Sequence, residues 1–299
     1  MIKDYLSRVK SNINIYTNKK TLRLLDGTYK SIYKGKSLDF DDLREYVVGD
    51  NIKDIDWKSS ARSGNILIRR YIAEKKHNFL FVLDSGEKML ADTVSGESKK
   101  NIAIITTGIL SYIANNHGDY TSSLFYSNNG LDNVAFNSSP LNVEKILSSY
   151  EKNISIENQI SINDMLNHVI KNIKKRMIIF VITDLAGMDS VTENTLKQIS
   201  ILNDLMFINI SDAYMTGNVA YDIDKRSYIP KSILTNNKLF DLEKNKRNEI
   251  ISSCNKKFNK YGVSSITINK ENEIVTNIID LLERHKNAII NWFKGSIFI

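Results

Sequence analysis

The stretch that decides the fold is Asn78-Phe79-Leu80-Phe81-Val82-Leu83, a continuous apolar run that ends at Asp84. An apolar run this short, without polar alternation, is typical of a strand that is buried on both faces of a parallel sheet. Two similar runs follow at residues 177–182 and 205–210. We therefore expect at least three buried strands in one sheet.

Helix-like segments separate these runs and continue after them. The predicted helices cover residues 99–116, 142–150, 162–174, 190–200, 244–260 and 273–286. A hairpin is expected from residues 121–126 and 131–136, and one more strand from 264–268. Buried strands that alternate with helices predict an α/β fold, in which helices cover both faces of a mostly parallel sheet.

The composition is that of an ordinary globular chain, but its charge is unevenly placed. The 299 residues are 42% hydrophobic and 25% charged, which suffices for a large core. Residues 1–76 contain 17 Lys and Arg against 10 Asp and Glu, and residues 77–299 contain 24 of each kind. The whole net charge of +7 therefore lies in the first quarter. Such a segment suits nucleic acid, an anionic membrane surface or an acidic protein, or is simply a solvated face.

The change of pattern near His77 predicts the domain boundaries. We expect a basic N-terminal segment at residues 1–76 packed on the core, an α/β domain at 77–290 and a short C-terminal tail at 291–299. The single cysteine, Cys254, is expected to be a buried thiol. No apolar run reaches the roughly 20 residues of a membrane helix, and the start lacks the apolar core of a signal peptide. The expected localisation is cytoplasmic.

Two of the predicted strands are followed by an aspartate, Asp84 in one case and Asp184 in the other. Ligands of parallel α/β sheets bind at the carboxyl ends of the strands, so these carboxylates could meet a divalent metal such as magnesium. The alternative is that each aspartate caps the helix that follows it.

A spaced pattern in residues 27–74 carries a family resemblance. Its main positions are Gly27, Ser31, Gly35, Phe40, Leu43-Arg44, Tyr46, Gly49-Asp50, Ile55-Asp56-Trp57, Ala61-Arg62 and Glu74. The pattern resembles the signature of the domain-of-unknown-function 58 family. The resemblance implies a von Willebrand factor A-like (Rossmann-like) domain after the signature. It also implies partnership with AAA+ ATPases of the MoxR type, in systems thought to assemble or activate other proteins.

The resemblance also implies a metal-ion-dependent adhesion site, whose first motif reads Asp-x-Ser-x-Ser. This chain has Asp84-Ser85-Gly86-Glu87-Lys88, so Gly86 and Lys88 replace both hydroxyl ligands. Asp184 matches the later aspartate of the site, and Ser161 is the candidate for its threonine position. We expect a degenerate site without a metal. Lys88 either places its ammonium beside the two aspartates or lies in solvent, and Glu87 offers one more oxygen for a reshaped site.

The charged and aromatic residues of the signature allow two interpretations. They are Arg44, Tyr46, Asp50, Asp56, Trp57, Arg62 and Arg69. In the first, Arg44 and Arg62 form ion pairs with Asp50 and Asp56 and hold the segment, with Trp57 buried, against the α/β domain. In the second, these side chains form a surface that anchors a partner, because Trp, Tyr and Arg are frequent interface anchors.

No catalytic constellation is visible in the sequence. The four histidines, His77, His117, His168 and His285, lack metal-ligand spacing and are expected at the surface or at element ends. We therefore expect a non-catalytic interaction or adaptor module, without a cofactor, that partners a MoxR-type AAA+ ATPase. Two alternatives stay open. One is a metal-dependent hydrolase that uses the strand-end aspartates, and the weaker one is a nucleic-acid binder that uses the basic N-terminal segment.

Overall fold

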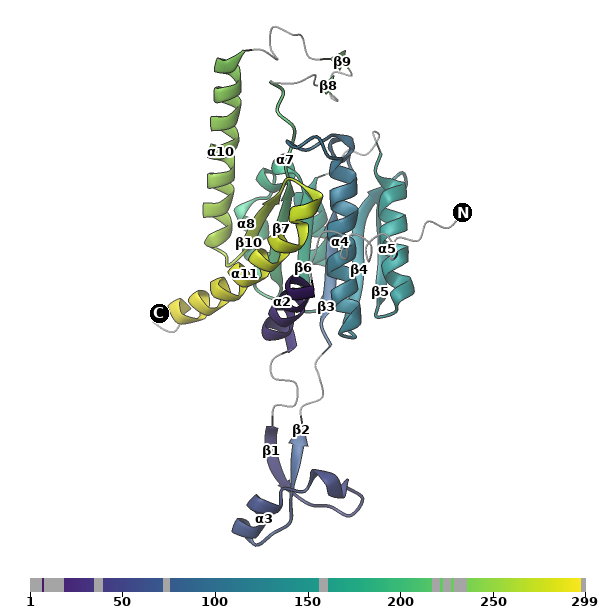
Figure 1. The fold of residues 1–299 in the computed structure, drawn as a ribbon, viewed down its shortest axis with the longest axis vertical. Helices are drawn as coiled ribbons and strands as arrows, with labels where there is room; N and C mark the ends of the chain where they lie inside the picture. The colour runs from purple at the N-terminus through teal and green to yellow at the C-terminus, as the bar shows by residue number, and fades with distance from the viewer. Residues whose placement is uncertain are drawn as a thin grey trace.

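A computed structural model describes residues 7, 19–34, 40–71, 76–155, 161–216, 221–222, 227–228 and 236–296. Its centre is a six-stranded sheet in the order β10-β7-β6-β3-β4-β5 (Figure 1). The strands are β3 (Asn78–Leu83), β4 (Tyr120–Ser127), β5 (Gly130–Asn137), β6 (Ile178–Thr183), β7 (Asp204–Ile210) and β10 (Ser264–Ile268). All neighbours pair in parallel except the hairpin of β4 and β5. The expected α/β fold with a mostly parallel sheet is confirmed.

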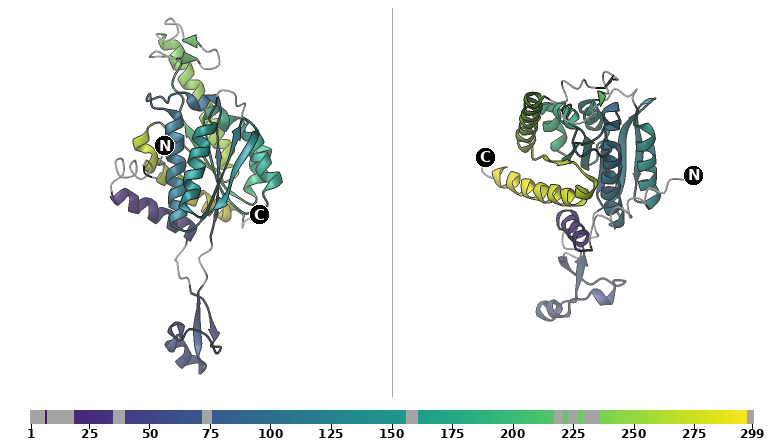
Figure 2. Two further views of the ribbon diagram at one scale, coloured as in Figure 1. Left: turned by 90° about the vertical axis from the view of Figure 1, so that its right-hand side faces the viewer. Right: turned by 45° about the horizontal axis from the view of Figure 1, so that its top comes forward.

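Helices cover both faces of this sheet, as Figure 2 shows from two further directions. One face packs against α2 (Lys19–Tyr29), α4 (Lys99–Asn116), α5 (Pro140–Asn153) and α11 (Ile274–Ser296). The other packs against α6 (Ile162–Asn172), α7 (Leu185–Asp189), α8 (Glu193–Ser200) and α10 (Asn237–Asn259). The predicted helices are all present, with boundaries that differ by several residues in places.

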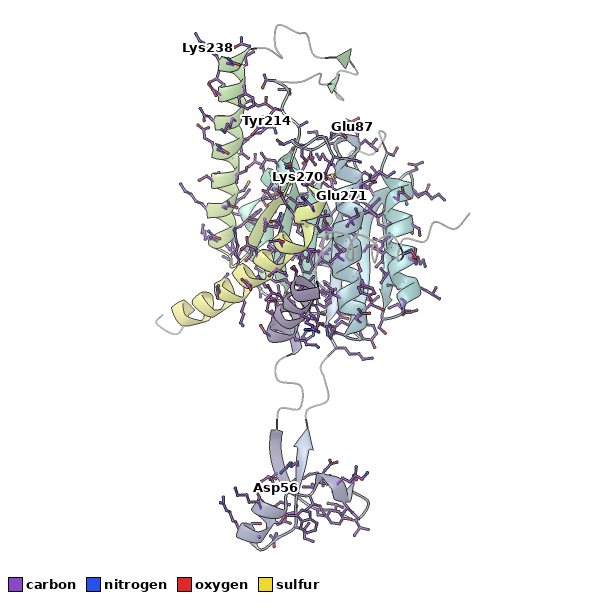
Figure 3. All side chains as sticks on the ribbon, in the orientation of Figure 1. Asp56, Glu87, Tyr214, Lys238, Lys270 and Glu271 are labelled. Carbon is purple, nitrogen blue, oxygen red and sulfur yellow. The ribbon has the colours of Figure 1, made fainter. Side chains whose placement is uncertain are left out.

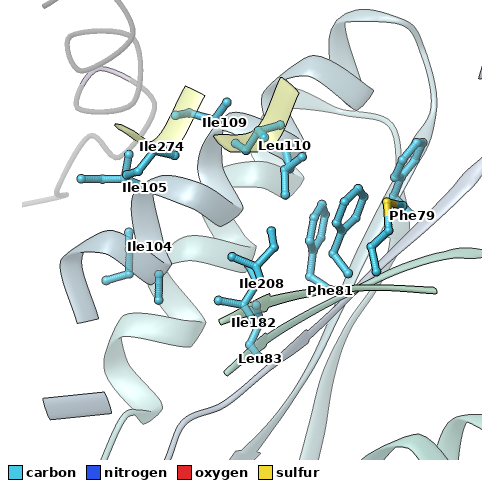
Figure 4. Close-up of a cluster of buried hydrophobic side chains, with 14 of the residues drawn as sticks. Phe79, Phe81, Leu83, Ile104, Ile105, Ile109, Leu110, Ile182, Ile208 and Ile274 are labelled. Atoms are coloured by element: carbon cyan, nitrogen blue, oxygen red, sulfur yellow. The ribbon is translucent and has the colours of Figure 1, made fainter. Parts of the chain in front are cut away.

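Strand β3 shows how the apolar run divides between the two faces. Phe79, Phe81 and Leu83 belong to the hydrophobic cluster under α4 and α11, part of which Figure 4 shows. Leu80 and Val82 belong to the cluster on the opposite face. Successive side chains of a strand point to opposite faces, so a strand covered by helices on both sides is apolar at most of its positions.

Polar caps set where the helices begin. Ser98, Ser161 and Thr192 each accept a hydrogen bond from a backbone N–H in the first turn of α4, α6 and α8. Such caps satisfy the otherwise unpaired donors of a helix start. Asn236 caps α10 in the same way, and therefore α10 starts seven residues before the predicted helix.

The N-terminal segment contributes to the core through α2 and the π-helical turn η1 (Lys30–Lys34). Leu25, Tyr29 and Tyr33 lie in the first hydrophobic cluster, and α2 packs against α11. The Tyr29 hydroxyl donates a hydrogen bond to the buried carboxylate of Asp119, which also accepts from the His77 backbone N–H at 2.8 Å. This end of the chain is therefore tied to the α/β domain by both apolar and polar contacts.

Residues 40–71 form a separate small unit, which we call the signature hairpin. It consists of β1 (Phe40–Glu45), the 3₁₀ turn η2 (Ile52–Asp54), α3 (Trp57–Ser63) and β2 (Leu67–Tyr71). Strands β1 and β2 make their own antiparallel sheet, and no described residue of the unit belongs to either core cluster. Figure 1 shows the hairpin apart from the six-stranded sheet, at the end opposite a further short pair, β8 (Tyr221–Asp222) and β9 (Ser227–Tyr228).

None of the described helices combines the length and the apolar character that a membrane crossing needs. Cys254 is buried against the second cluster, and burial raises the pKa of its thiol to about 11. A thiol with a raised pKa is a poor nucleophile at neutral pH, which agrees with the structural role expected for it.

His285 contradicts the expectation that the histidines lie at the surface or at element ends. It lies within α11, its side chain is 1% exposed, and neither ring nitrogen has a hydrogen-bond partner among the residues that the structure describes. Burial lowers the pKa of this imidazole, although the nearby charge of Asp204 acts in the opposite direction.

Because His285 is buried in its neutral form, we expect the protein to lose stability at acidic pH. The unfolded chain takes up a proton at His285 near pH 6.5, whereas the folded chain does so only at lower pH. The contribution of neutral His285 to the free energy of unfolding is therefore fully present above pH 6.5. It is lost as the pH falls through the folded pKa, by at most about 1.4 kcal/mol per pH unit. His285→Phe should flatten this loss in urea titrations at pH 7.5 and 5.5, while His168→Phe, at an exposed position, should not. Equal pH dependence in both variants would contradict this assignment.

Candidate functional site

Asp84 and Asp184 lie side by side at the carboxyl edge of the sheet. Strands β3 and β6 are neighbours, and the Asp84 backbone N–H donates to the Ile182 carbonyl at 3.0 Å. Both aspartates are buried. Figure 3 labels Glu87 and Tyr214 at this end of the molecule, and Asp56 of the signature hairpin at the opposite end.

A lysine and a third aspartate complete the group. Lys99 is the first residue of α4, and its side chain is 0% exposed. Its ammonium donates to Asp184 Oδ2 at 3.3 Å and to Asp212 Oδ1. Asp212 lies two residues after β7, so each of three adjacent strands is followed by one of these aspartates. We call Asp84, Lys99, Asp184 and Asp212 the aspartate–lysine cluster.

Lys99 corrects the sequence-based hypothesis for Lys88. Lys88 is exposed in the short turn η3 (Glu87–Leu90), so its ammonium does not enter the cluster. The cation comes instead from the start of α4, where Ser98 caps the helix and the Lys99 backbone N–H bonds to the Ala91 carbonyl at 3.1 Å. A lysine in the first turn of a predominantly apolar helix was the only sequence signal for this role.

Three further carboxylate oxygens of the cluster accept hydrogen bonds. Asp84 Oδ1 accepts from the Gly86 N–H at 3.0 Å, and its Oδ2 accepts from the Thr183 hydroxyl at 2.7 Å. Asp184 Oδ1 caps α7 by accepting from the Gly187 N–H at 2.9 Å, which is the capping role left open by the sequence. A Cβ at position 187 would lie 1.9 Å from Thr183 Oγ1, so only glycine leaves that hydroxyl in place.

The loop that carries Asp212 is fixed to α10. The Arg247 guanidinium donates to the backbone carbonyls of Asp212 and Ala213, and it pairs with Glu243 at 2.6 Å. It also lies over the Tyr214 ring, 4.6 Å from its centroid. Asp212 is therefore held in position by an ordered loop.

Burial and the neighbouring negative charge of Asp184 both raise the pKa of two carboxyls, those of Asp84 and Asp212. Burial, followed by the charge of Asp184, raises the pKa of Asp84. Burial also raises the pKa of Asp212, against the effect of the Lys99 ammonium. Three carboxylates around one ammonium leave an excess of negative charge, which explains why Lys99 is needed there.

A resident divalent metal does not fit this donor set. The motif positions 86 and 88 lack hydroxyl groups, and the Ser85 hydroxyl is bonded to the backbone of Tyr126. Ser161 uses its hydroxyl to cap α6, accepting from the Asp164 N–H at 3.1 Å. The Lys99 ammonium stands between Asp184 and Asp212, where it would repel a second cation. In the described part of the chain, no three His, Cys, Asp or Glu side chains are arranged to hold a metal ion.

The signature residues form ion pairs within the hairpin. Arg44 pairs with Asp50 at 2.6 Å, and Asp50 also accepts from the Val47 N–H at 2.9 Å. Asp56 caps α3 and pairs with Arg69 at 3.0 Å. The expected pair of Arg62 with Asp56 is wrong, because Arg69 on β2 takes that position.

Trp57 is not buried, which contradicts the idea that it fastens the segment to the α/β domain. Its side chain is 65% exposed at the first position of α3. The small interior of the hairpin is made instead by Ile55 and Ile68, which form a β-bridge. Tyr46, which directly follows β1, is half-buried. Further apolar side chains of the unit are exposed, namely those of Val47, Val48, Ile52 and Ile66.

A pocket of about 260 Å³ lies beside the edge strand β10, between α10 and α11. Its polar lining consists of amides, hydroxyls and one ion pair, from Asn209, Asn255, Ser265, Thr267, Asn277, Asp280 and Arg284. The Ser265 hydroxyl donates to Asn255 Oδ1 at 2.7 Å, and Arg284 is paired with Asp280. None of the lining residues is a histidine or a cysteine, so this pocket offers no nucleophile with a matched base.

Comparison with solved structures finds similar folds at low sequence identity. BatB, a conserved hypothetical protein from Bacteroides thetaiotaomicron, is 14% identical over 71% of this chain and 99% of its own, with a TM-score of 0.44. An aerotolerance-related membrane protein from Bacteroides fragilis is 16% identical over 70% and 99%, with a TM-score of 0.41. A von Willebrand factor type A protein from Catenulispora acidiphila is 8% identical over 72% and 43%, with a TM-score of 0.41. A search of curated proteins finds no match.

One protein family matches more than half of the chain. The model of the family described as protein of unknown function DUF58 matches residues 42–215. The match begins within the signature hairpin and runs through β7 to the loop that carries Asp212. With its six-stranded sheet and two helical layers, this chain belongs to the DUF58 family and has a von Willebrand factor A-like fold.

Proposed function

We propose that this protein is a non-catalytic interaction module that binds a MoxR-type AAA+ ATPase through its signature hairpin. The observation that carries the proposal is the exposure of Trp57, Val47, Val48 and Ile52 on one small unit. Exposed apolar side chains that gather on one element are typical of a binding surface, and tryptophan is a frequent energetic anchor. The family resemblance described above supplies the class of partner.

The hairpin carries exposed charges that can contribute to a contact with a partner. Two of its carboxylates, Asp50 and Asp56, are neutralised within the unit by Arg44 and Arg69. Lys53, Lys58 and Arg62 are exposed, and among the described residues they form no ion pair. The hairpin as a whole contains six acidic and six basic residues, so its net charge favours neither an acidic nor a basic partner surface. Unpaired charges at the rim of an interface steer association and are screened by salt.

The aspartate–lysine cluster supports a role without catalysis. Asp84 and Asp184 are buried and hydrogen-bonded, and Lys99 pairs with Asp184 and Asp212, so the cluster offers no open site to a metal-activated water. The metal-dependent hydrolase is therefore the less favoured candidate. A partner that hydrolyses ATP works where ATP is present, and we propose a cytoplasmic location on this ground.

Trp57→Ala tests the proposal without disturbing the fold. Because the side chain is exposed, its removal should change the free energy of unfolding by no more than about 0.5 kcal/mol. The same substitution should weaken binding to the ATPase about tenfold or more, which corresponds to at least about 1.4 kcal/mol. The measurements are urea denaturation and calorimetric titration of the purified MoxR-type ATPase from the same source, with ADP and with a slowly hydrolysed ATP analogue.

Leu141→Ala is the matched control, because Leu141 is also an exposed apolar residue but lies on α5. It should leave the affinity unchanged. Equal affinities of the Trp57 variant and the wild type would remove the hairpin from the interface. Absence of any complex with the wild type, together with tight salt-dependent binding of DNA or RNA, would reject the adaptor role and support the nucleic-acid alternative.

A further inference from the structure

We infer that Lys99 is a built-in cation that takes the place of a divalent ion in this chain. The cluster is then closed to metals in the native protein, and it becomes a metal site only when the ammonium of Lys99 is removed. This inference concerns the carboxyl edge of the sheet and does not depend on which partner the signature hairpin binds.

The first support is the burial and pairing of Lys99. A buried ammonium is stable only where carboxylates or other acceptors compensate for its lost hydration. Lys99 is 0% exposed and contacts Asp184 and Asp212, which follow adjacent strands. Asp84 lies close enough for its carboxyl to be affected by the same charge. The ammonium therefore pairs directly with two carboxylates and acts through its charge on a third, and the three carboxylates follow three adjacent strands.

The second support is that the cation is fixed in place. The Lys99 backbone N–H bonds to the Ala91 carbonyl at 3.1 Å, and Ser98 caps the helix that begins there. Asp212 is held from the other side, because Arg247 binds its backbone carbonyl. A covalently attached cation in a closed position cannot exchange with solvent, and it offers no open coordination position to an acidic group of a partner.

The third support is what remains when the lysine is shortened. Lys99→Ser would remove the ammonium and most of the aliphatic stem but leave a hydroxyl at the start of α4. The oxygens of Asp184 and Asp212, with water in the vacated space, then form the kind of donor set that hard divalent cations prefer. The excess negative charge of the cluster would favour uptake of such an ion.

The test measures Mn²⁺ binding to the full chain by calorimetry and by the electron paramagnetic resonance signal of free Mn²⁺. We expect Lys99→Ser to bind one Mn²⁺ at micromolar concentration, with Mg²⁺ as a competitor, and its melting temperature to rise when Mn²⁺ is added. The wild type and Lys88→Ser, which alters the exposed lysine of the same motif, should bind none. Adding Asp184→Asn to Lys99→Ser should abolish the binding.

Two results would overturn the inference. One is stoichiometric Mn²⁺ binding by the wild type that Asp184→Asn abolishes, and the other is a folded Lys99→Ser variant that binds no Mn²⁺. If Lys99→Ser does not fold even with Mn²⁺ present, Lys99→Gln decides the question, since glutamine keeps much of the stem and loses the charge. Its melting temperature should fall, and Asp184→Asn in the same chain should recover part of the loss. Failure to recover any of it would show that Lys99 does not compensate for that carboxylate.

Discussion

Lys99→Met should lower the free energy of unfolding by about 3 kcal/mol at neutral pH. Methionine preserves the length and the apolar contacts of the stem but leaves Asp184 without its cation inside the protein. Removal of one partner of a buried ion pair costs this much because the other charge stays buried. We place the value at the lower end of the usual range because Asp212 is about one-third exposed to solvent.

The pH dependence of the destabilisation by Lys99→Met provides a second test of the role of Lys99. Burial raises the pKa of Asp84 and Asp212, so each carboxyl contributes stability at low pH that is lost as the pH rises through its folded pKa. Without Lys99 this effect should grow, because the cation no longer favours the ionised forms. The difference between Lys99→Met and the wild type should therefore be larger at pH 7 than at pH 5, as measured by urea denaturation.

Lys88→Met is the control for both measurements, since Lys88 is exposed and its removal should change stability by no more than about 0.5 kcal/mol. If both lysine variants unfolded with the same free energy, the buried ammonium would have no role in holding the strand ends together.

Tyr29→Ala should lower the free energy of unfolding by about 3–5 kcal/mol, the usual cost of truncating a buried aromatic side chain. The Tyr29 ring lies between those of Phe79 and His117, at centroid distances of 5.8 and 4.9 Å. Its hydroxyl also satisfies the buried carboxylate of Asp119. The loss therefore combines a cavity in the core with a buried carboxylate that loses one of its donors.

Two further substitutions separate these contributions. Tyr29→Phe keeps the ring and should cost only about 1–3 kcal/mol, the penalty for leaving a buried acceptor without its donor. Leu24→Ala, at an exposed position on the same helix, should change stability by no more than about 0.5 kcal/mol. Urea denaturation curves of the three variants measure whether the loss of stability decreases from Tyr29→Ala to Tyr29→Phe to Leu24→Ala. Indistinguishable curves for Tyr29→Ala and Leu24→Ala would show that α2 is not fastened through its tyrosine.

Local pattern was enough to predict the framework of this protein. The apolar runs at residues 78–83, 177–182 and 205–210 became adjacent parallel strands, because a strand covered on both faces is apolar at most positions. The Asn-Asn-Gly turn between two alternating runs became the β4–β5 hairpin, in which Gly130 has the positive φ of 98° that favours glycine. The spaced residues of the signature indicated the family, which the match over residues 42–215 confirms.

The same pattern could not predict how the signature residues are placed. Arg62 and Arg69 both lie within reach of Asp56 along the chain, and the bridge between Ile55 and Ile68 puts Asp56 beside Arg69 on β2. Trp57 ends the run Ile55-Asp56-Trp57 and was therefore expected to be buried. It is exposed because the hairpin is too small to enclose more than Ile55 and Ile68.

The aspartate–lysine cluster shows most clearly which contacts the sequence pattern predicts and which only the tertiary structure decides. The sequence placed Asp84 and Asp184 at strand ends, and strand order makes them neighbours. Lys88 looked like the nearby cation because it is four residues from Asp84, but its turn directs it to solvent. Lys99 reaches Asp184, which is 85 residues away, because α4 begins beside the ends of β6 and β7. Hydrophobic periodicity specifies which faces are buried, whereas contacts between distant charges are set by the order of the strands and by where each helix begins.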